Sequence, residues 1–308
     1  MTKLALLFAG QGAQKLGMAR DFYDAYPIAK ETFEQAKEIL GYDLRQLIDH
    51  DGEKLNQTRF TQPAILTTSI AIYRVLESYD IKPDMVAGLS LGEYSALVAS
   101  GAISFEEALK LVAKRGQFME EAAPAGTGKM VAVLNTPASL IEDICQKASA
   151  KGIVSPANYN TPGQIVIGGE IEAVNDALEL LKEAGVKRLI PLNVSGPFHT
   201  ALLETASQKL SEELKMISFN EFDCPLIGNT EAELMMKEDI PQLLARQVKE
   251  PVRFYESIKK LQERGCDQVI EIGPGSILSG FIKKIDKNLK TTSIEDISSL
   301  RHYLEGRN

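Results

Sequence analysis

The sequence predicts an α/β protein that is built on a parallel sheet and carries a smaller inserted unit. Three strand-like runs, Leu4 to Ala9, Met85 to Leu89 and Gln268 to Ile272, are each followed by a glycine-containing turn and a helical pattern. This order is typical of a parallel sheet with helices on its faces. Because the first and last runs lie near opposite ends of the chain, we expect one core formed by residues 1–125 and 195–308.

The inserted unit is predicted from a change of pattern between residues 126 and 194. Strand-like and helical runs follow one another there in the order β-α-β-β-α-β, at Met130 to Leu134, Pro137 to Ala150, Ile153 to Ala157, Gln164 to Gly168, Glu170 to Ala184 and Lys187 to Val194. That order is that of a ferredoxin-like unit. An insert of this kind leaves a cleft between two bodies, where ligands are commonly bound.

Composition excludes several classes of protein. The 308 residues are 44% hydrophobic and 25% charged, which argues against disordered and collagen-like chains. A net charge of −8 argues against nonspecific nucleic-acid binding. The three cysteines are widely spaced and not grouped with histidine, so we expect no disulfide framework, no metal site and a reducing cytoplasm. The run Leu4 to Ala9 is too short to span a membrane, and we expect no membrane partner.

Two glycine-rich stretches resemble nucleotide-binding motifs but lack essential positions. Gly10-Gln11-Gly12 follows a strand, yet Lys15 stands where a dinucleotide fingerprint needs its third glycine. In Gly126-Thr127-Gly128-Lys129 the lysine is followed by Met130, where a P-loop needs Ser or Thr. Neither stretch therefore predicts a bound nucleotide cofactor.

The candidate nucleophile is Ser90, in the complete G-x-S-x-G motif Gly88-Leu89-Ser90-Leu91-Gly92. A strand-like run precedes the motif and a helical run follows it, as in a nucleophile elbow, which makes the expected core hydrolase-like. The glycines permit a turn so tight that larger side chains would collide. The Leu91 amide, at the start of the helix, is placed to stabilise an oxyanion. The alternative is a buried serine at a structural turn.

A serine hydroxyl needs a base, and the chain has three histidines. His50 lies in a polar run that predicts a surface turn, and His302 lies near a polar C-terminus. His199 follows the last strand of the insert, in a loop placed to present an imidazole to the cleft. Elimination favours His199 as the base, with a hydrogen-bonded histidine of no chemical role as the alternative.

Arg115 is a charge on the apolar face of a predicted helix. Ser104 and Glu107 form a capping box that opens this helix, which runs to about Ala122, and Arg115 falls between Ala108 and Ala122 on the apolar side. A guanidinium cannot lose its charge to escape burial, so it needs an anionic partner or a cleft. Two interpretations stay open: an internal salt bridge or an outward-reaching side chain, and a planar fork that binds a substrate carboxylate.

Together these features resemble the malonyl-CoA:acyl carrier protein transacylase family of bacterial fatty acid synthesis. The resemblance covers nearly the whole chain. Its parts are Phe8-Ala9-Gly10-Gln11-Gly12-Ala13-Gln14, Thr61-Gln62-Pro63-Ala64, the Ser90 motif continued by Glu93-Tyr94-Ser95-Ala96, Arg115-Gly116, Asn158-Tyr159-Asn160-Thr161-Pro162-Gly163-Gln164, Gly196-Pro197-Phe198-His199, Gln247 with Pro251-Val252, and Glu271-Ile272-Gly273-Pro274-Gly275.

The resemblance implies a role for each matching position. Malonyl-CoA would be the donor, the phosphopantetheine thiol of acyl carrier protein the acceptor, and no cofactor or metal would be bound. The implied site consists of Ser90 as the acylated nucleophile, His199 as its general base, the Gln11 and Leu91 amides as the oxyanion hole, Arg115 as the malonyl carboxylate ligand, the Gln247 carbonyl as the group that orients the histidine, Asn160 as a nearby polar residue and Phe198 as a selector for malonyl. One departure is Leu89, where many relatives have histidine.

The docking surface and the competing functions rest on weaker signals. Lys283, Lys284, Lys287 and Lys290 are predicted on one helix, where they form either a surface for the acidic carrier protein or an ordinary solvated face.

The rival functions are a serine hydrolase with water as acceptor, a transferase for a branched malonyl group, and a binding module without chemistry.

Overall fold

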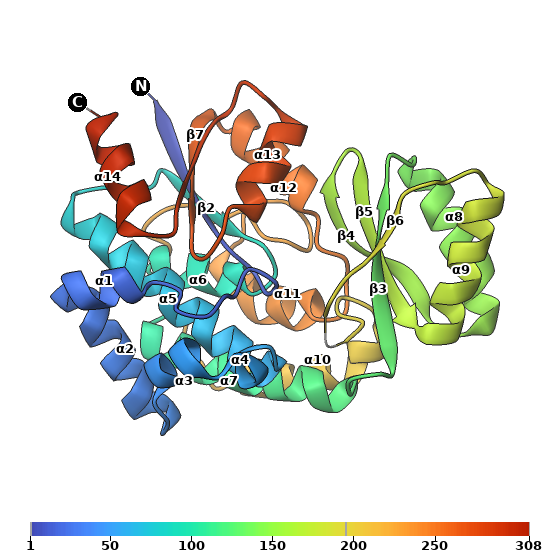
Figure 1. Cartoon of the computed structure of the whole chain (residues 1–308), viewed down its shortest axis with the longest axis horizontal. Coiled ribbons are helices and arrows are strands. Elements are labelled where there is room, and N and C mark those ends of the chain that lie inside the picture. Colours follow the sequence, from blue (N-terminus) through green and yellow to red (C-terminus); the bar gives the residue numbers. More distant parts are fainter. Residues whose placement is uncertain (1, 195, 308) are drawn as a thin grey trace.

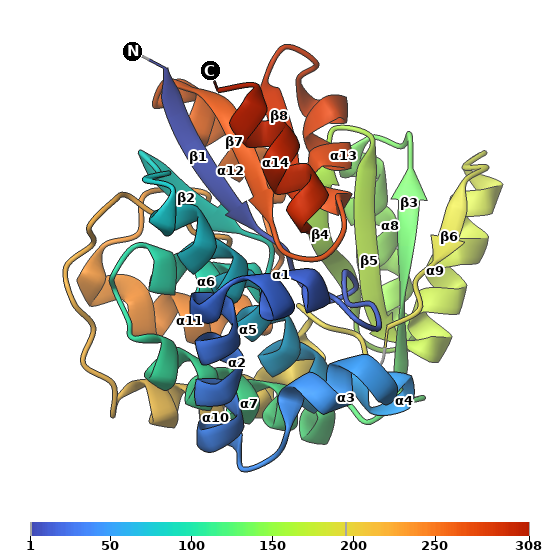
Figure 2. The ribbon, with the colours of Figure 1, turned by 60° about the vertical axis from the view of Figure 1, so that its left-hand side comes forward.

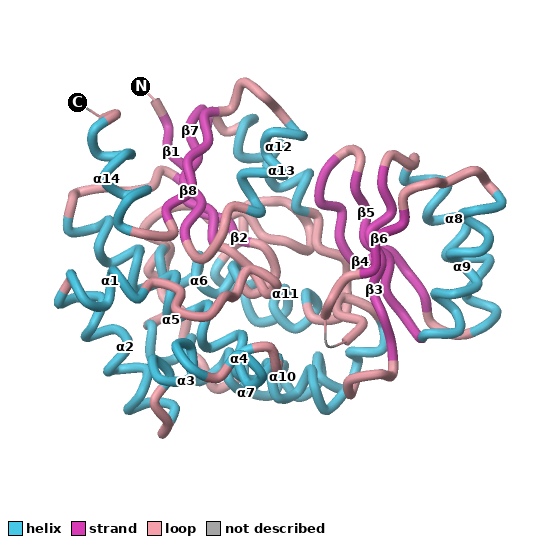
Figure 3. Tube along the Cα trace, in the orientation of Figure 1, coloured by secondary structure: helices cyan, strands magenta, loops and turns pink. Residues whose placement is uncertain are grey.

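The computed structural model describes residues 2–194 and 196–307, so the predicted boundaries at residues 1, 195 and 308 lie outside it. Its strands form two separate sheets, which Figure 3 shows as two magenta groups. The first sheet is parallel and has the order β2-β1-β7-β8. Its strands are β1 (Lys3–Phe8), β2 (Met85–Gly88), β7 (Cys266–Ile272) and β8 (Lys290–Ile294).

Helices cover the parallel sheet on both faces, which explains why the strands β1 and β2 are nearly continuous apolar runs. In β1, Leu6 and Phe8 pack into one hydrophobic cluster while Ala5 and Leu7 pack into another on the opposite face. The helices that precede the insert are α1 (Arg20–Ala25), α2 (Pro27–Leu40), α3 (Leu44–His50), α4 (Gly52–Leu55), α5 (Thr58–Ser78), α6 (Gly92–Ala99) and α7 (Phe105–Ala122). Those that follow it are α10 (Glu204–Leu214), α11 (Ile240–Gln247), α12 (Phe254–Glu263), α13 (Ile277–Ile285) and α14 (Ile297–Glu305).

The second sheet is antiparallel, with the strand order β4-β5-β3-β6. It comprises β3 (Gly128–Leu134), β4 (Val154–Thr161), β5 (Gln164–Glu170) and β6 (Leu189–Pro191), with α8 (Ala138–Ala148) and α9 (Ile171–Glu183) covering its outer face (Figures 1 and 2). Residues alternate between its faces: Val131 and Val133 pack under these helices, whereas Met130 and Ala132 line a cleft toward the parallel sheet.

The element order of the insert is as predicted, but two local predictions are wrong. The last strand, predicted over Lys187 to Val194, has only three residues in β6, because the chain after Pro191 turns into the wall of the cleft. The helix predicted to carry four lysines ends at Ile285. There Asp286 accepts a hydrogen bond from the backbone of Asn288, which favours a turn over another helical residue.

The four lysines therefore lie on three kinds of structure. Lys283 and Lys284 close α13, Lys287 lies in the turn, and Lys290 opens β8. All four side chains are exposed.

Candidate active site

Ser90 lies at the turn between β2 and α6, with the strained backbone of a nucleophile elbow. Its φ of 53° is in the left-handed region, which residues other than glycine rarely adopt. A Cβ atom on Gly88 would lie 2.1 Å from the carbonyl carbon of Gly92, and one on Gly92 would lie 2.0 Å from the oxygen of Phe8. Only glycine fits at either position, so the two glycines allow the helix to turn directly off the strand.

Asn229 holds this turn from a neighbouring segment, a role that the sequence did not indicate. The Ser90 backbone N–H donates to its Oδ1 at 2.6 Å, and its Nδ2 donates to the Gly88 oxygen at 2.6 Å. The segment before Asn229 runs beside β2, where Leu226 forms a bridge with Val86. The side chain therefore spans the two ends of the strained turn.

His199 faces Ser90 from the other side of the cleft. Its Nε2 lies 2.8 Å from Ser90 Oγ, and its Nδ1 lies 2.6 Å from the main-chain oxygen of Gln247. A carbonyl oxygen only accepts hydrogen bonds, so Nδ1 carries the proton and Nε2 is free to accept one from the serine. Gln247 is the last residue of α11, where carbonyls lack helical partners and the helix end favours a developing imidazolium charge.

The surroundings keep the imidazole neutral. His199 is buried, and burial followed by the charge of Arg115 lowers its pKa from 6.5 to about 4. At neutral pH the ring is therefore in the form that accepts a proton. The other two histidines are exposed: His50 ends α3 instead of occupying a surface turn, and His302 lies within α14.

Arg115 lies behind the serine, on α7, and is 1% exposed. Its Nη1 donates to Gln62 Oε1 at 2.7 Å, while its Nη2 donates to Gln247 Oε1 at 2.9 Å and to Ser90 Oγ at 3.2 Å. Its Cζ lies 5.2 Å from the centre of the Tyr94 ring. Within the described residues its hydrogen-bond partners are two amides and a hydroxyl, none of them a carboxylate.

That environment bears on the two interpretations of Arg115 that the sequence left open. A carboxylate partner within the described chain would have made it an internal salt bridge, and an exposed head group would have made it an outward-reaching side chain; neither is present. Burial without a directly bonded carboxylate is unfavourable and lowers the pKa of the guanidinium, although the charge of nearby Glu93 partly opposes that shift. An anionic ligand placed beside Ser90 would supply a carboxylate that bonds the guanidinium directly.

Two backbone amides, those of Leu91 and Gln11, are candidate donors to developing negative charge. Leu91 precedes the first residue of α6, and Gln11 lies in the turn after β1. Gly10 brings that turn against the elbow, since a Cβ there would lie 2.3 Å from the Leu89 oxygen. Among the described residues neither amide has an acceptor, whereas the adjacent Ser90 and Gly12 amides do. Such a pair of free donors is what an oxyanion hole requires.

Gln11, Ser90 and His199 line a cleft of about 420 Å³ between the two sheets. Phe198 is buried at its wall. Asn160, on β4, is also buried, and its Nδ2 donates to Gln164 Oε1 at 3.0 Å while its own Oδ1 has no partner in the described part of the chain. The lining comes from both sheets and from the loops between them: Gln11, Gly12, Leu89, Ser90, Met119, Met130, Ala132, Asn158, Asn160, Gln164, Val166, Leu192, Asn193, Val194, Phe198, His199, Ile277 and Phe281.

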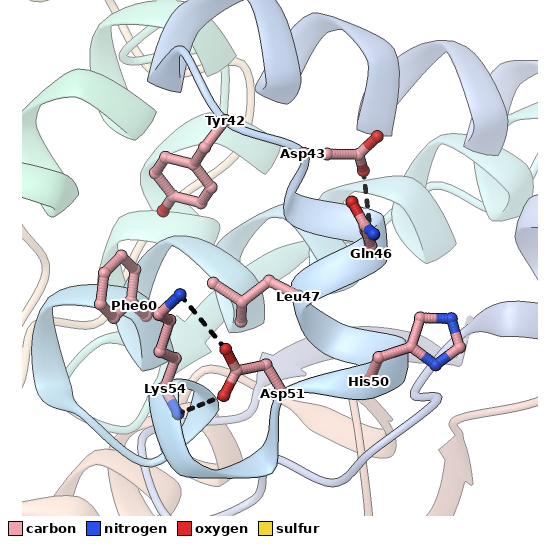
Figure 4. Close-up of a pocket in the computed structure, with 8 residues that line it drawn as sticks. All are labelled: Tyr42, Asp43, Gln46, Leu47, His50, Asp51, Lys54 and Phe60. Carbon is pink, nitrogen blue, oxygen red and sulfur yellow. Dashed lines mark hydrogen bonds and ion pairs between the residues drawn. The ribbon is translucent and has the colours of Figure 1, made fainter.

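A second pocket of about 590 Å³ lies beside α3 and α4 (Figure 4) and contains none of the predicted site residues. His50 lies in its lining, whereas Ser90 lines the cleft between the sheets. Asp43 accepts from the Gln46 backbone and Asp51 from the Lys54 backbone, so these carboxylates serve as helix caps. The pocket beside α3 and α4 therefore contains a histidine but none of the predicted nucleophilic or carboxylate-binding residues.

Among the described residues, no group of three or more His, Cys, Asp or Glu side chains is placed to hold a metal ion. No helix in that part of the chain is long and apolar enough to cross a membrane.

Comparison with known proteins assigns the family. Residues 5–301 match the model of the acyl transferase domain. The malonyl CoA-acyl carrier protein transacylase of Bacillus subtilis is 48% identical over 299 residues, covering 96% of this chain and 94% of the relative. The enzyme of the same name from Escherichia coli K12 is 43% identical over 308 residues, covering 99% of this chain and 100% of the relative.

Solved structures agree over the same length. The crystal structure of MCAT from Streptococcus pneumoniae is 68% identical, with a TM-score of 0.97, and covers 99% of this chain and 100% of its own. PlMCAT, solved with the type II PKS acyl-carrier protein AntF, is 42% identical with a TM-score of 0.96 and the same coverage. The chain is therefore an acyltransferase of the acyl transferase domain family, and it belongs to the malonyl CoA-acyl carrier protein transacylases.

Proposed function

We propose that the protein transfers a malonyl group from malonyl-CoA to the phosphopantetheine thiol of acyl carrier protein, through an acyl-enzyme on Ser90, and so supplies malonyl units for fatty acid synthesis. The observation that carries the proposal is the position of Arg115. Its Nη2 lies 3.2 Å from Ser90 Oγ, and its described partners include no carboxylate. A buried cation beside a nucleophile suits an acyl group that itself carries a carboxylate.

In the first half-reaction, His199 Nε2 accepts the Ser90 proton while Oγ attacks the malonyl thioester carbon. The oxyanion that forms accepts hydrogen bonds from the Gln11 and Leu91 amides. As the intermediate collapses, the carbon–sulfur bond breaks and the imidazolium gives its proton to the departing thiolate of coenzyme A. The malonyl ester remains on Ser90, with its carboxylate bound to Arg115.

The second half-reaction reverses these roles with a new thiol. The phosphopantetheine thiol gives its proton to His199 and attacks the ester carbon, and the same amides hold the oxyanion. When the bond from carbon to Oγ breaks, the proton returns to Ser90 and malonyl-carrier protein leaves. One product departs before the second substrate binds, which is a ping-pong sequence. No acidic third member is needed, because the Gln247 carbonyl orients the imidazole.

The fold suits this chemistry. We assign the parallel sheet to a hydrolase-like core of residues 1–125 and 195–308, and residues 126–194 to a ferredoxin-like subdomain. The strand order β4-β5-β3-β6 with α8 and α9 on one face supports the second assignment. Asn160 and Phe198 belong to the pocket in this proposal, the first as a polar contact and the second as a steric limit on the acyl group. The free cysteines Cys145, Cys224 and Cys266 favour a cytoplasmic setting.

The proposal uses no bound cofactor, since donor and acceptor bring the two thiols. Exposed Lys283 and Lys284, at the end of a helix whose Ile277 and Phe281 line the cleft, are the proposed contact for the acidic carrier protein.

Intact-protein mass spectrometry after brief mixing with malonyl-CoA or acetyl-CoA tests the proposal, followed by peptide mapping and a chase with carrier protein. We expect one malonyl group on Ser90, little acetyl, and transfer of the malonyl group to the carrier thiol. Release of coenzyme A without an adduct or a carrier product would instead identify a hydrolase. Neither adduct nor release would point to a binding module.

A further inference from the structure

Glu93 is a buried carboxylate that the mechanism above does not use. It lies in the first turn of α6, three residues after Ser90, and is 1% exposed. Its hydrogen-bond partners within the described residues are two amide groups: the backbone N–H of Asn229 donates to Oε1 at 2.8 Å, and Gln247 Nε2 donates to Oε2. Burial raises its pKa from 4.5 to about 7, which shows how unfavourable the charge is at this place. A neutral side chain would avoid that penalty.

The bond from Gln247 fixes which end of its amide faces Arg115. Gln247 Nε2 has two hydrogens, and it donates to Glu93 Oε2 and to the Ser90 main-chain oxygen, the latter at 2.9 Å. Both donors are then used on one side, so Oε1 is turned toward Arg115 Nη2 at 2.9 Å. The reverse orientation would place an NH₂ group against the guanidinium, donor against donor.

The bond from Asn229 secures the serine turn. Glu93 Oε1 holds the Asn229 backbone, and the Asn229 side chain joins the Ser90 N–H to the Gly88 oxygen. These two bonds cross a turn whose central residue has a φ of 53°. One Glu93 oxygen is thus linked to the Ser90 backbone through Asn229. The other is linked to Arg115 through the side chain of Gln247.

We propose that Glu93 is a positioning residue of the acyl-transfer site: it orients Gln247 so that Arg115 meets the substrate carboxylate, and it holds Asn229 so that the Ser90 elbow keeps its shape. Glu93 touches neither substrate nor reacting atoms. The proposal rests on the function proposed above, and it adds a determinant of the preference for malonyl over acetyl.

Glu93→Gln is the direct test, because it keeps size and removes one acceptor. The glutamine introduced there still accepts from the Asn229 backbone with its oxygen. Its NH₂ group then opposes Gln247 Nε2, so the Gln247 amide must turn and present its nitrogen to Arg115. Because a hydrogen bond to a charged group is lost, we expect the malonyl-to-acetyl ratio of Ser90 acylation rates to fall about tenfold.

Gln247→Leu gives a second, independent route to the same result. It removes the amide and retains the main-chain carbonyl that holds His199. We expect a similar fall in the malonyl-to-acetyl ratio, and no further fall when Glu93→Gln is added. If the two substitutions multiply their effects on the ratio, Glu93 does not act through Gln247 and the proposal is wrong.

Asp49→Asn is the matched control for general loss of stability. Asp49 is also a nearly buried carboxylate, 9% exposed, but it pairs with Arg45 on α3 and has no contact with the site. We expect a lower melting temperature with an unchanged malonyl-to-acetyl ratio. If Glu93→Gln behaves like Asp49→Asn, with equal losses for both donors, the role of Glu93 is merely structural. If the unchanged protein forms no malonyl adduct on Ser90, the proposed function itself fails, which is a separate result.

Discussion

The imidazole of His199 donates from Nδ1 to the main-chain oxygen of Gln247 at 2.6 Å, so a carbonyl at the end of α11 occupies the position that an acid takes in a serine triad. A carbonyl has no proton to gain or lose. The pH dependence of acylation is therefore determined by the ionisation of the imidazole and of its buried neighbours. No triad carboxylate contributes to it.

The first prediction concerns that pH dependence. Burial and the Arg115 charge lower the pKa of His199 to about 4, so the imidazole is protonated and inactive only in more acidic solution. We expect the rate of Ser90 acylation by malonyl-CoA to rise with pH around this value, measured by rapid quenching and mass spectrometry. Glu93, whose pKa is raised to about 7, is the second group that can titrate nearby.

The same profile in Glu93→Gln separates the two groups. With the carboxyl group gone, we expect a flat rate from about pH 6 upward, since the imidazole is then almost fully neutral. A rise centred near the ordinary histidine pKa in that variant would mean that the ring is not buried as described.

The second prediction concerns the carboxylate ligand. In Arg115→Ala, malonyl transfer should fall by about a hundredfold or more, because a charge-assisted pair of hydrogen bonds to the substrate is lost. Acetyl transfer should fall far less, since acetyl has no carboxylate for the guanidinium to bind. Rates of acyl-enzyme formation with both donors measure this difference.

The matched control is Lys114→Ala, one residue earlier on the same helix. Lys114 forms an exposed ion pair with Glu213, and its loss should leave both rates nearly unchanged. Equal losses for the two donors in Arg115→Ala would remove Arg115 from the carboxylate role.

The third prediction concerns the elbow glycines. Gly88→Ala places a Cβ atom 2.1 Å from the Gly92 backbone, an overlap that only a shift of α6 against β2 can relieve. We expect the free energy of unfolding to fall by about 3 kcal/mol or more, measured by denaturant titration.

Gly280→Ala, in the middle of α13, is the control with the same change of side chain. A Cβ there meets no atom within 4 Å, and alanine favours a helix by up to about 1 kcal/mol over glycine. This variant should be as stable as the unchanged protein or more so. A stable Gly88→Ala variant would show that the elbow is looser than its contacts imply.

The fourth prediction concerns the steric limit at Phe198. This ring is 7% exposed at the wall of the cleft, and Phe198→Ser replaces it with a small side chain beside His199. The ratio of methylmalonyl to malonyl adduct on Ser90 should rise, while stability falls by about 3 kcal/mol from the lost packing. An unchanged ratio in a folded variant would exclude Phe198 as a selector.

The fifth prediction concerns docking of the carrier protein. Reversing Lys283 and Lys284 to Glu should raise the KM for carrier protein roughly threefold to tenfold through repulsion of an acidic partner. Acylation of Ser90 by malonyl-CoA alone should be unchanged.

Lys147 and Lys182, on the outer helices α8 and α9, provide a control with the same change in net charge. Reversing that pair should leave both half-reactions as they were. If the Lys283 and Lys284 variant also has an unchanged KM, the carrier protein docks elsewhere.

The sequence predicted those parts of the molecule that depend on local pattern. Strand-like runs bounded by glycine gave β1, β2 and β7, and the G-x-S-x-G spacing gave the elbow at Ser90. Arg115 could be selected because its charge stands on an apolar helix face. In each case the signal lies within a few residues of the feature.

The supporting network could not be predicted in this way. Asn229 has no neighbours in sequence that mark it, and its role exists only because its segment runs beside β2. Glu93 carries a signal, a charge in the first turn of an otherwise apolar helix, but its partners come from two distant segments. Lys287 and Lys290 were wrongly predicted to lie on the helix. The apolar spacing continues past Ile285, but the chain forms a turn at Asp286 instead.

The position of β1 between β2 and β7 sets the order in which the chain can fold during its synthesis. β1 leaves the ribosome well before residues 266–272, yet its pairing with β7 requires those residues. The antiparallel sheet is complete by residue 191, so its strands can pair while β7 is still being made. A nascent chain that stops before β7 leaves one edge of β1 open and apolar, ready to pair with another molecule. A stop codon between the codons for residues 191 and 266 should therefore yield an aggregating product more readily than a partly active one.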